Sequence, residues 1–248
     1  MCGFLFHCSF HRNLIPSTNS LELLSRRGPD SLVTIQKSYL IGTSNPSKAE
    51  RSGELKVTAV ASVLSLRGEA VISQPLYDNE TGSLFCWNGE AWKFKGKDVH
   101  GNDAKMIFHS LICQMKHAHN ELNDPADQYE LSAAGIRDVL GSVDGPFSFV
   151  FYDARYQRIF YGRDSLGRRS LLQYEHGAED FLISSVQNGT HDGWQEIGAS
   201  GISVVNLIES SFLSNRPTPD VINSRMRLPQ PSSFPWSDIR AVRISFIN

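Results

Sequence analysis

Cys2 is the first residue in the sequence that could do chemistry. It stands directly after Met1, so removal of Met1 would leave a thiol and a free α-amine on one residue. Thiols attack as thiolates, and an ordinary cysteine has a pKa of about 8.5. An α-amine, with a pKa of about 7.7–8.0, can accept the proton without a separate histidine. Cys2 is therefore a candidate nucleophile that carries its own base.

Asn88 and Gly89 could stabilise the charge that such a nucleophile creates. They follow an apolar, strand-like run, residues 83–87. An asparagine amide and a glycine N–H that no side chain shields can both donate hydrogen bonds to a developing oxyanion. Asn-Gly is also one of the commonest turn dipeptides. A plain turn is therefore the alternative for this pair.

Asp103 stands just before residues 104–117, in which apolar side chains recur at helical spacing. Either Asn102 or Asp103 would cap that helix, and capping is a sufficient structural explanation of both residues.

Length, composition and net charge indicate the size of the domain and the partners to expect. The chain has 248 residues, 40% of them hydrophobic, and a net charge of −2. This is enough for one large domain, or for one domain with an appended segment. Without a basic excess, neither nucleic acid nor an anionic membrane surface is an expected partner. No stretch approaches the roughly 18 apolar residues of a membrane span, so no membrane association is predicted.

The four cysteines form no CxxC pair and lack the dense, even spacing of a secreted disulfide scaffold. A reducing, cytoplasmic location is therefore predicted. No set of histidines and cysteines has the spacing of a zinc site, so no metal is expected in this chain.

Strands dominate the predicted elements. Alternating or β-branched runs predict strands at residues 3–10, 32–35, 39–42, 55–66, 83–87, 147–152, 158–162, 181–185 and 203–207. Helices are predicted at residues 20–25, 104–117 and 131–140. The polar stretches 42–53 and 117–129 are predicted as loops, and the prolines gathered in 215–235 indicate a linker or wrapped tail.

Six motifs occur in one order along the chain: Met1-Cys2-Gly3, Arg27-Gly28-Pro29-Asp30, Asn88-Gly89-Glu90, Gly101-Asn102-Asp103, Gly145-Pro146-Phe147-Ser148-Phe149 and Gly162-Arg163-Asp164-Ser165-Leu166-Gly167-Arg168. Together they resemble the class II glutamine amidotransferase domain of the asparagine synthetase family. The resemblance implies an α+β protein with the N-terminal nucleophile hydrolase fold, a four-layer αββα sandwich of two antiparallel sheets. It covers residues 2–208, and residues 209–248 are then a Pro-rich linker or tail leading toward an absent synthetase domain.

The resemblance also implies roles for the candidate residues. Cys2 would attack the side-chain amide of glutamine, with its own α-amine as proton shuttle, and Asn88 and the Gly89 N–H would hold the oxyanion. Asp103 would bind the α-amino group of glutamine. Glu90 and Arg67 are further substrate-binding candidates. The implied activity is hydrolysis of glutamine to glutamate and ammonia for an asparagine-synthetase-like reaction.

Two departures from the family pattern limit this prediction. Val63 stands where the family usually places an arginine that binds the α-carboxylate of glutamine, and losing such a charged partner would cost about 1.5–3 kcal/mol. Arg67 would replace it if the strand brings both positions to one face. The phosphate-loop pattern SGGxDS of a synthetase domain is absent from the sequence. ATP and Mg²⁺ would then be needed only by a synthetase domain or subunit supplied elsewhere, and this chain needs no cofactor.

Two alternatives remain open at this point. One is a catalytically degenerate amidotransferase fold kept for binding or regulation, which Val63 and the missing synthetase domain favour. The other is a peptidase-like N-terminal nucleophile hydrolase, which explains Cys2 but leaves Asp103 and the Arg27–Asp30 turn without a role.

Overall fold

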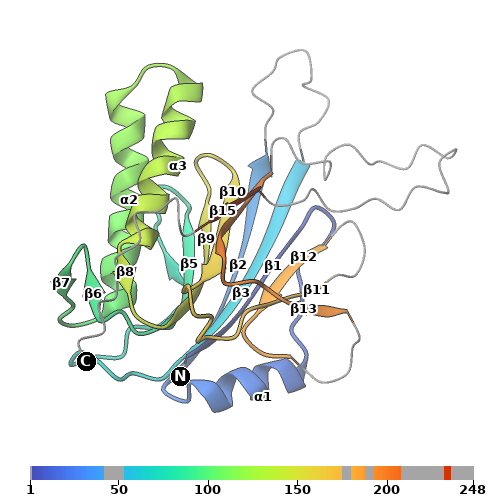
Figure 1. Ribbon diagram of the computed structural model, residues 1–248. Coiled ribbons are helices and arrows are strands. Elements are labelled where there is room, and N and C mark those ends of the chain that lie inside the picture. The colour runs from blue at the N-terminus through green and yellow to red at the C-terminus, as the bar shows by residue number, and fades with distance from the viewer. Residues whose placement is uncertain (1, 42–52, 175–179, 188–192, 208–231, 236–248) are drawn as a thin grey trace, which may run out of the picture.

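The structure is a computed structural model that describes residues 2–41, 53–174, 180–187, 193–207 and 232–235 (Figure 1). Met1 lies outside the described residues. So do nearly all of the loop predicted at 42–53 and most of the predicted tail, 209–248.

Two six-stranded sheets form the centre of the molecule (Figure 1). The first has the order β13 (Trp194–Glu196), β11 (Leu172–Tyr174), β12 (Asp180–Ser184), β1 (Gly3–Ser9), β3 (Gly53–Val63), β2 (Ser31–Ile41). The second has the order β15 (Ser232–Pro235), β14 (Gly201–Asn206), β10 (Arg158–Arg163), β9 (Phe147–Asp153), β5 (Leu84–Gly89), β4 (Leu76–Tyr77). Every neighbouring pair of strands in both sheets is antiparallel.

Three short strands make a small third sheet beside the second one: β7 (Lys97–Asp98), β6 (Lys93–Phe94) and β8 (Val143–Asp144). β6 and β7 lie in the connection that follows β5, and β8, which directly precedes β9 in the chain, pairs with β6.

Helices cover the outer face of each sheet. Helix α1 (Thr18–Arg27) packs Leu24 against Leu5 and Val60 of the first sheet. Helices α2 (Asp103–Glu121) and α3 (Pro125–Gly141) pack on the aromatic outer face of the second sheet. The inner faces of the sheets meet in a common core, and the prediction of a four-layer αββα sandwich of antiparallel sheets is confirmed.

Strand β1 shows why the sequence builds these layers. Its side chains alternate between the two faces of the sheet, as in any strand. Phe4 and Phe6 point into the core between the sheets, and Leu5 points toward α1. Every residue of β1 is buried, and its first half, residues 3–6, is apolar because both faces of the strand are covered.

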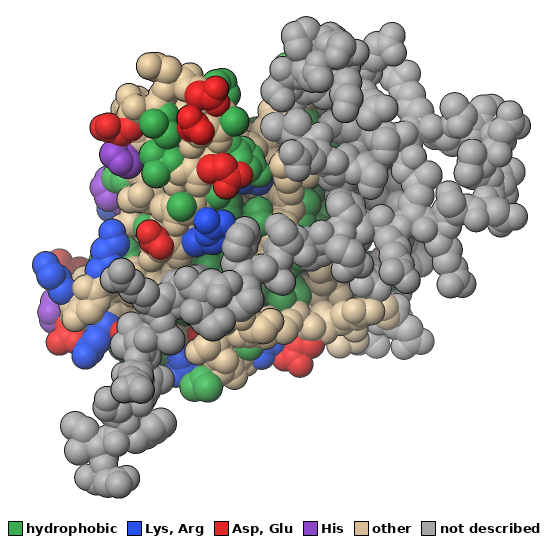
Figure 2. All heavy atoms as spheres, turned by 45° about the horizontal axis from the view of Figure 1, so that its top comes forward, with side chains coloured by type: hydrophobic (Ala, Val, Ile, Leu, Met, Phe, Trp, Pro, Cys, Tyr) green, Lys and Arg blue, Asp and Glu red, His purple; other side chains and the backbone are tan. Residues whose placement is uncertain are grey.

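The predicted loop at 117–129 is wrong. Helix α2 continues to Glu121, and α3 already begins at Pro125, so only residues 122–124 connect them. Asp124 caps α3 by accepting hydrogen bonds from the first-turn N–H groups, and a proline fits the first helical position because its missing donor is not needed there. The charged and histidine side chains of this stretch belong to the outward faces of the two helices (Figure 2), which explains the polar composition.

The first sheet also differs from expectation at its edge. The strands predicted at 32–35 and 39–42 are one strand, β2, whose exposed polar middle, residues 36–38, interrupted the apolar pattern. It is an edge strand, so polar side chains there stay in solvent while the backbone pairs with β3. The strand predicted at 55–66 ends at Val63, and residues 64–66 leave the sheet.

None of the helices in the described ranges is long and apolar enough to cross a bilayer.

Candidate active site

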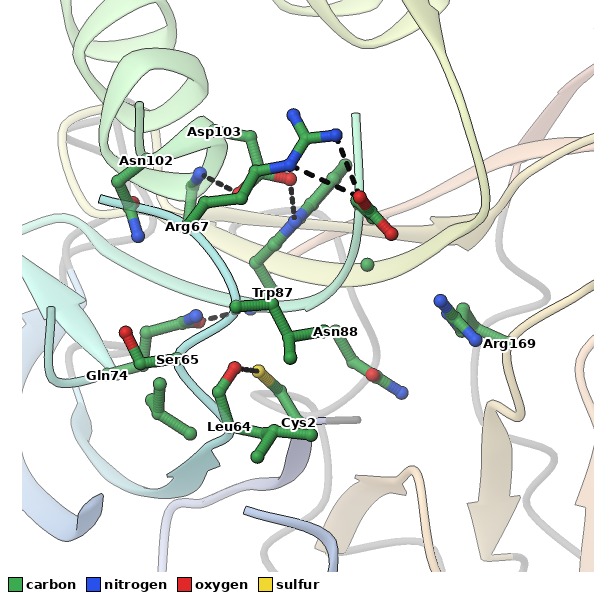
Figure 3. A pocket seen from close by; sticks show the side chains of 15 residues that line it. Cys2, Leu64, Ser65, Arg67, Gln74, Trp87, Asn88, Asn102, Asp103 and Arg169 are labelled. Atoms are coloured by element: carbon green, nitrogen blue, oxygen red, sulfur yellow. Dashed lines mark hydrogen bonds and ion pairs between the residues drawn. The ribbon is translucent and has the colours of Figure 1, made fainter. Parts of the chain in front are cut away.

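A pocket lies where the ends of several elements meet (Figure 3). Cys2 enters it just before β1, the segment after β3 forms one wall, the end of β5 forms another, and the start of α2 closes it. The lining residues are Cys2, Val63, Leu64, Ser65, Leu66, Arg67, Gln74, Trp87, Asn88, Gly89, Glu90, Asn102, Asp103, Ala104 and Arg169. All six candidate residues, Cys2, Asn88, Gly89, Asp103, Glu90 and Arg67, therefore lie in one site.

Cys2 is half-buried, and its Sγ lies 3.8 Å from the carbonyl oxygen of Leu64. Burial raises the pKa of the Cys2 thiol, and the contact with the Leu64 carbonyl and, more weakly, the positive charge of Arg169 oppose that rise. A thiol in this setting is mostly protonated at neutral pH and needs a base to react.

The Arg27–Asp30 turn fixes the wall that Cys2 contacts. The Asp30 N–H donates to the Val63 carbonyl at 3.0 Å, and the Asp30 carboxylate accepts from the Ser65 N–H at 2.7 Å. A Cβ on Gly28 would lie 2.4 Å from the Val63 nitrogen, so only glycine allows the end of α1 to approach β3 this closely. The turn is therefore structural, because it holds the Leu64 carbonyl beside Cys2.

Asn88 lies in strand β5, where it pairs with Ser148 of β9, and the alternative of a plain turn is wrong. Its side chain is 1% exposed. Neither its Nδ2 nor its Oδ1 has a hydrogen-bond partner among the described residues. A buried amide left unpaired costs roughly 1–3 kcal/mol, so such groups in folded proteins call for an explanation. A ligand in the pocket would provide it.

The Gly89 N–H points to the edge of β5 that faces away from β9. In a strand, successive N–H groups point to opposite edges. The Glu90 N–H bonds the Pro146 carbonyl next to β9, and the Trp87 N–H points the other way, to Gln74 Oε1 at 2.8 Å. Gly89 therefore shares the Trp87 direction, along the edge of β5 that β4 leaves uncovered beyond Phe85.

Gly89 is required at its position by packing as well. A Cβ there would lie 2.6 Å from the Phe147 Cβ and 2.7 Å from the Pro146 carbonyl oxygen. A larger residue would push the end of β5 away from β9, and the Asn88 amide would move with it.

Asp103 is buried and accepts three hydrogen bonds: from Trp87 Nε1 at 3.1 Å, from the Ala91 N–H at 2.8 Å and from the Ala104 N–H at 2.9 Å. Burial raises the pKa of this carboxyl, and the donors oppose the rise. Asp103 is not the cap of helix α2. The Asn102 side chain caps this helix by accepting a hydrogen bond from the Lys105 N–H. Asp103 is therefore a carboxylate held rigidly at the pocket.

Arg67 and Glu90 form an ion pair at the wall of the pocket. Arg67 Nη2 and Nε lie 2.7 and 3.2 Å from Glu90 Oε1, and Arg67 Nη1 donates to the Ala91 carbonyl at 2.9 Å. Because β3 ends at Val63, strand alternation does not decide the direction of Arg67, which reaches the pocket from the segment after the strand.

Residues 63–189 match a family model described as a glutamine amidotransferase domain. The chain belongs to this family. It is 33% identical over 219 residues to asparagine synthetase domain-containing protein 1 of Bos taurus, covering 86% of this chain and 29% of that protein. The protein of the same name from Homo sapiens is 30% identical over 214 residues, covering 84% and 28%. The chain thus spans less than a third of the length of these relatives.

Among solved structures, glutamine phosphoribosylpyrophosphate amidotransferase from B. subtilis is 12% identical with a TM-score of 0.42, covering 82% of this chain and 47% of that one. The fold of this amidotransferase domain is assigned from the two antiparallel sheets and the covering helices described above.

Gln74 and Arg169 also line the amidotransferase pocket, and neither was among the predicted site residues. Gln74 is buried and fixes β5 through the Trp87 N–H. Arg169 lines the pocket from the segment before β11. Both lie in motifs that the sequence displays, a Gln-Pro turn and a Gly-Arg-Arg run, but neither motif indicates by itself that the side chain faces Cys2.

Proposed function

We propose that this amidotransferase domain hydrolyses glutamine to glutamate and ammonia, with Cys2 as the nucleophile after removal of Met1. The observation that carries the proposal is the buried amide of Asn88, which has no partner among the described residues and lies with Gly89 in the same pocket as Cys2. A preorganised donor pair beside a thiol suits acyl transfer, in which negative charge develops on a carbonyl oxygen.

The reaction has two stages. Cys2 Sγ attacks the side-chain carbonyl carbon of glutamine while the α-amine of Cys2 takes the thiol proton, and the Asn88 amide and the Gly89 N–H stabilise the oxyanion. The C–N bond then breaks, the proton passes to the leaving nitrogen, and ammonia departs. Water attacks the resulting thioester, its proton returns to the sulfur through the same amine, and glutamate is released.

Asp103 is the proposed ligand of the substrate's α-ammonium group. Its three N–H donors fix the carboxylate and oppose the rise in its pKa that burial causes. Glu90 and Arg67 are proposed to complete the polar wall around the bound amino acid.

Ammonia released in the pocket would serve an asparagine-synthetase-like reaction on a separate domain or subunit, which would also be the place for ATP and Mg²⁺. The names of the relatives support this partner. A reducing, cytoplasmic setting remains a prediction, and all four cysteines are free thiols, as such a setting requires.

The test is glutamate release from glutamine by purified protein whose mature N-terminus has been checked by intact mass. Cys2→Ala should abolish turnover, and Cys113→Ala, which changes an exposed cysteine on α2 outside the pocket, should leave it unchanged. Protein with a free Cys2 that fails to turn over glutamine would contradict the proposal and favour the binding role.

A further inference from the structure

Outside the pocket, the exposed face of helix α2 carries a histidine and a cysteine one turn apart. His109 and Cys113 are both exposed, and His109 Nε2 lies 3.5 Å from Cys113 Sγ. Residues i and i+4 of a helix are neighbours on its surface, so the helix itself brings these two side chains together. They form a pair of metal-ligating atoms that the proposed glutamine chemistry does not use.

The separation of these two atoms is that of two ligands on one tetrahedral metal ion. Zinc–sulfur bonds of about 2.3 Å and zinc–nitrogen bonds of about 2.0–2.1 Å, at a tetrahedral angle, place the sulfur and the nitrogen about 3.5–3.6 Å apart. The two side chains therefore need little movement to bind an ion between them. The same distance suits an S–H···N hydrogen bond, so a bound ion takes the place of one proton.

Helix α2 holds the pair in place. Leu111, Ile112 and Met115 of this helix are buried in the core between the helices and the second sheet. Side chains on a packed helix are positioned more precisely than side chains on loops. The pair is fixed by the core on one side of the helix and is accessible to ions on the other.

The charges around the pair are compatible with a divalent cation. Lys116 lies one turn after Cys113, and its ammonium group is paired with the Glu80 carboxylate at 2.6 Å. Further along the same helix, His117 Nδ1 lies 3.8 Å from the Glu121 carboxylate. The two carboxylates therefore contribute negative charge to this side of α2.

The pair offers two protein ligands to one ion. Throughout the described part of the chain, no three histidine, cysteine or acidic side chains are grouped so that they could hold one metal ion. Water would complete the coordination, which makes the ion exchangeable. The sequence predicted no metal because it lacks the spacing of a full zinc site, and a pair at helical spacing is a smaller arrangement.

We propose that His109 and Cys113 form a surface binding site for Zn²⁺ or a chemically similar divalent ion. Thiolate and imidazole ligands suit zinc, whereas magnesium and calcium prefer oxygen ligands. The Cys113 thiol loses its proton to solvent, and its sulfur and the lone pair of His109 Nε2 bind the ion. Neither residue lines the pocket around Cys2, so this site does not depend on the proposed function.

The test uses Co²⁺, whose thiolate complexes absorb strongly in the near ultraviolet, and untagged Cys2→Ala protein. The substitution removes a second thiol that lies beside a free amine, and Cys8 and Cys86 are buried. A single equivalent of Co²⁺ should produce the thiolate absorption. Zn²⁺ should abolish it by displacement, and excess Mg²⁺ should not. Adding Cys113→Ser should remove the absorption, and adding His109→Ala should weaken Co²⁺ binding about tenfold or more.

His117→Ala is the matched control, because it removes an exposed histidine from the same helix. It should leave the affinity for Co²⁺ nearly unchanged. A protein that shows no thiolate absorption, or one that keeps its full affinity after His109→Ala, would overturn the proposal. The same holds if His117→Ala weakens binding as much as His109→Ala does. Glutamine turnover is not measured, so the result is independent of whether the pocket is catalytic.

Discussion

Strand β9 has a buried polar region at each of its ends, and the two regions differ in whether their polar groups have hydrogen-bond partners. At one end, Asp153 and Arg158 are 0% exposed and fully engaged: Arg158 bonds Asp153 at 2.8 Å, the Tyr129 carbonyl at 2.9 Å and the Ser132 hydroxyl at 2.7 Å. At the other end, Ser148 lies beside Asn88, whose amide is equally buried and has no partner among the described residues.

The difference separates stability from function. A buried polar network contributes to a unique, stable fold only when its members are paired. An unpaired buried amide is a cost to the folded protein, and it is useful only if something else binds there. The Asp153 end of β9 is therefore interpreted as structural, and the Asn88 end as the site where a ligand completes the hydrogen bonding.

Arg158→Met should produce the largest change in stability. It leaves the Asp153 carboxylate buried without its cation, so the free energy of unfolding should fall by about 3–5 kcal/mol in urea denaturation. KM for glutamine should be almost unaffected in whatever fraction remains folded.

The loss from Arg158→Met should depend on pH. Burial already raises the pKa of Asp153 in the folded state, and Arg158 opposes the rise. Without Arg158 the folded-state pKa rises further above the unfolded value, so stability is retained at low pH and lost as pH increases through that pKa. The variant should lie closest to wild type near pH 4, about the unfolded pKa of an aspartate. Adding Asp153→Asn should flatten the difference, and a loss independent of pH would contradict the pairing argument.

Asn88→Ala should have the opposite effect to Arg158→Met: a large loss of activity with little change in stability. Removing one donor from an oxyanion site lowers kcat by about 10²–10³-fold, measured as glutamate release at saturating glutamine. Stability should stay the same or increase slightly, because a buried amide without a partner disappears. A strong loss of stability together with unchanged kcat would show that this end of β9 is structural like the other.

Asp30→Ala should have the smallest effect of the three substitutions. It removes the hydrogen bond that holds Ser65, so the Leu64 carbonyl beside Cys2 is less well fixed. A single hydrogen bond of about 0.5–1.5 kcal/mol predicts a fall in kcat of roughly twofold to tenfold. Glu22→Gln, on the exposed face of the neighbouring helix α1, is the control and should change neither kcat nor stability measurably. If both variants behave alike, the turn does not position the site.

Much of the fold could be predicted because its causes are local. The apolar run of β1, the aromatic strand β9 and the amphipathic part of α2 show their periodicity directly in the sequence. The predictions failed at residues 36–38 and 117–129. Apart from the connection at 122–124, the backbone of both stretches is regular. Most of their side chains face solvent, so their polar composition resembles that of a loop.

The sequence by itself determined which residues are capable of the chemistry: a cysteine near the N-terminus, an Asn-Gly pair after a strand, and an Asp at the start of a helix. These depend on residue type and short spacing. It could not decide whether Asn102 or Asp103 caps α2, because that choice depends on what Asp103 meets across the fold.

Only the tertiary structure decided that Cys2, Asn88, Asp103 and Arg169 share one pocket. They are brought together by contacts between residues far apart in the chain, such as Asp30 with Ser65 and Ser148 with Ser170. The engagement of Arg67 by Glu90 is of the same kind, since an ion pair forms only when packing brings both side chains to one wall. Long-range packing of this sort leaves no periodic signal in a sequence, and it determines which charges a substrate meets in the pocket.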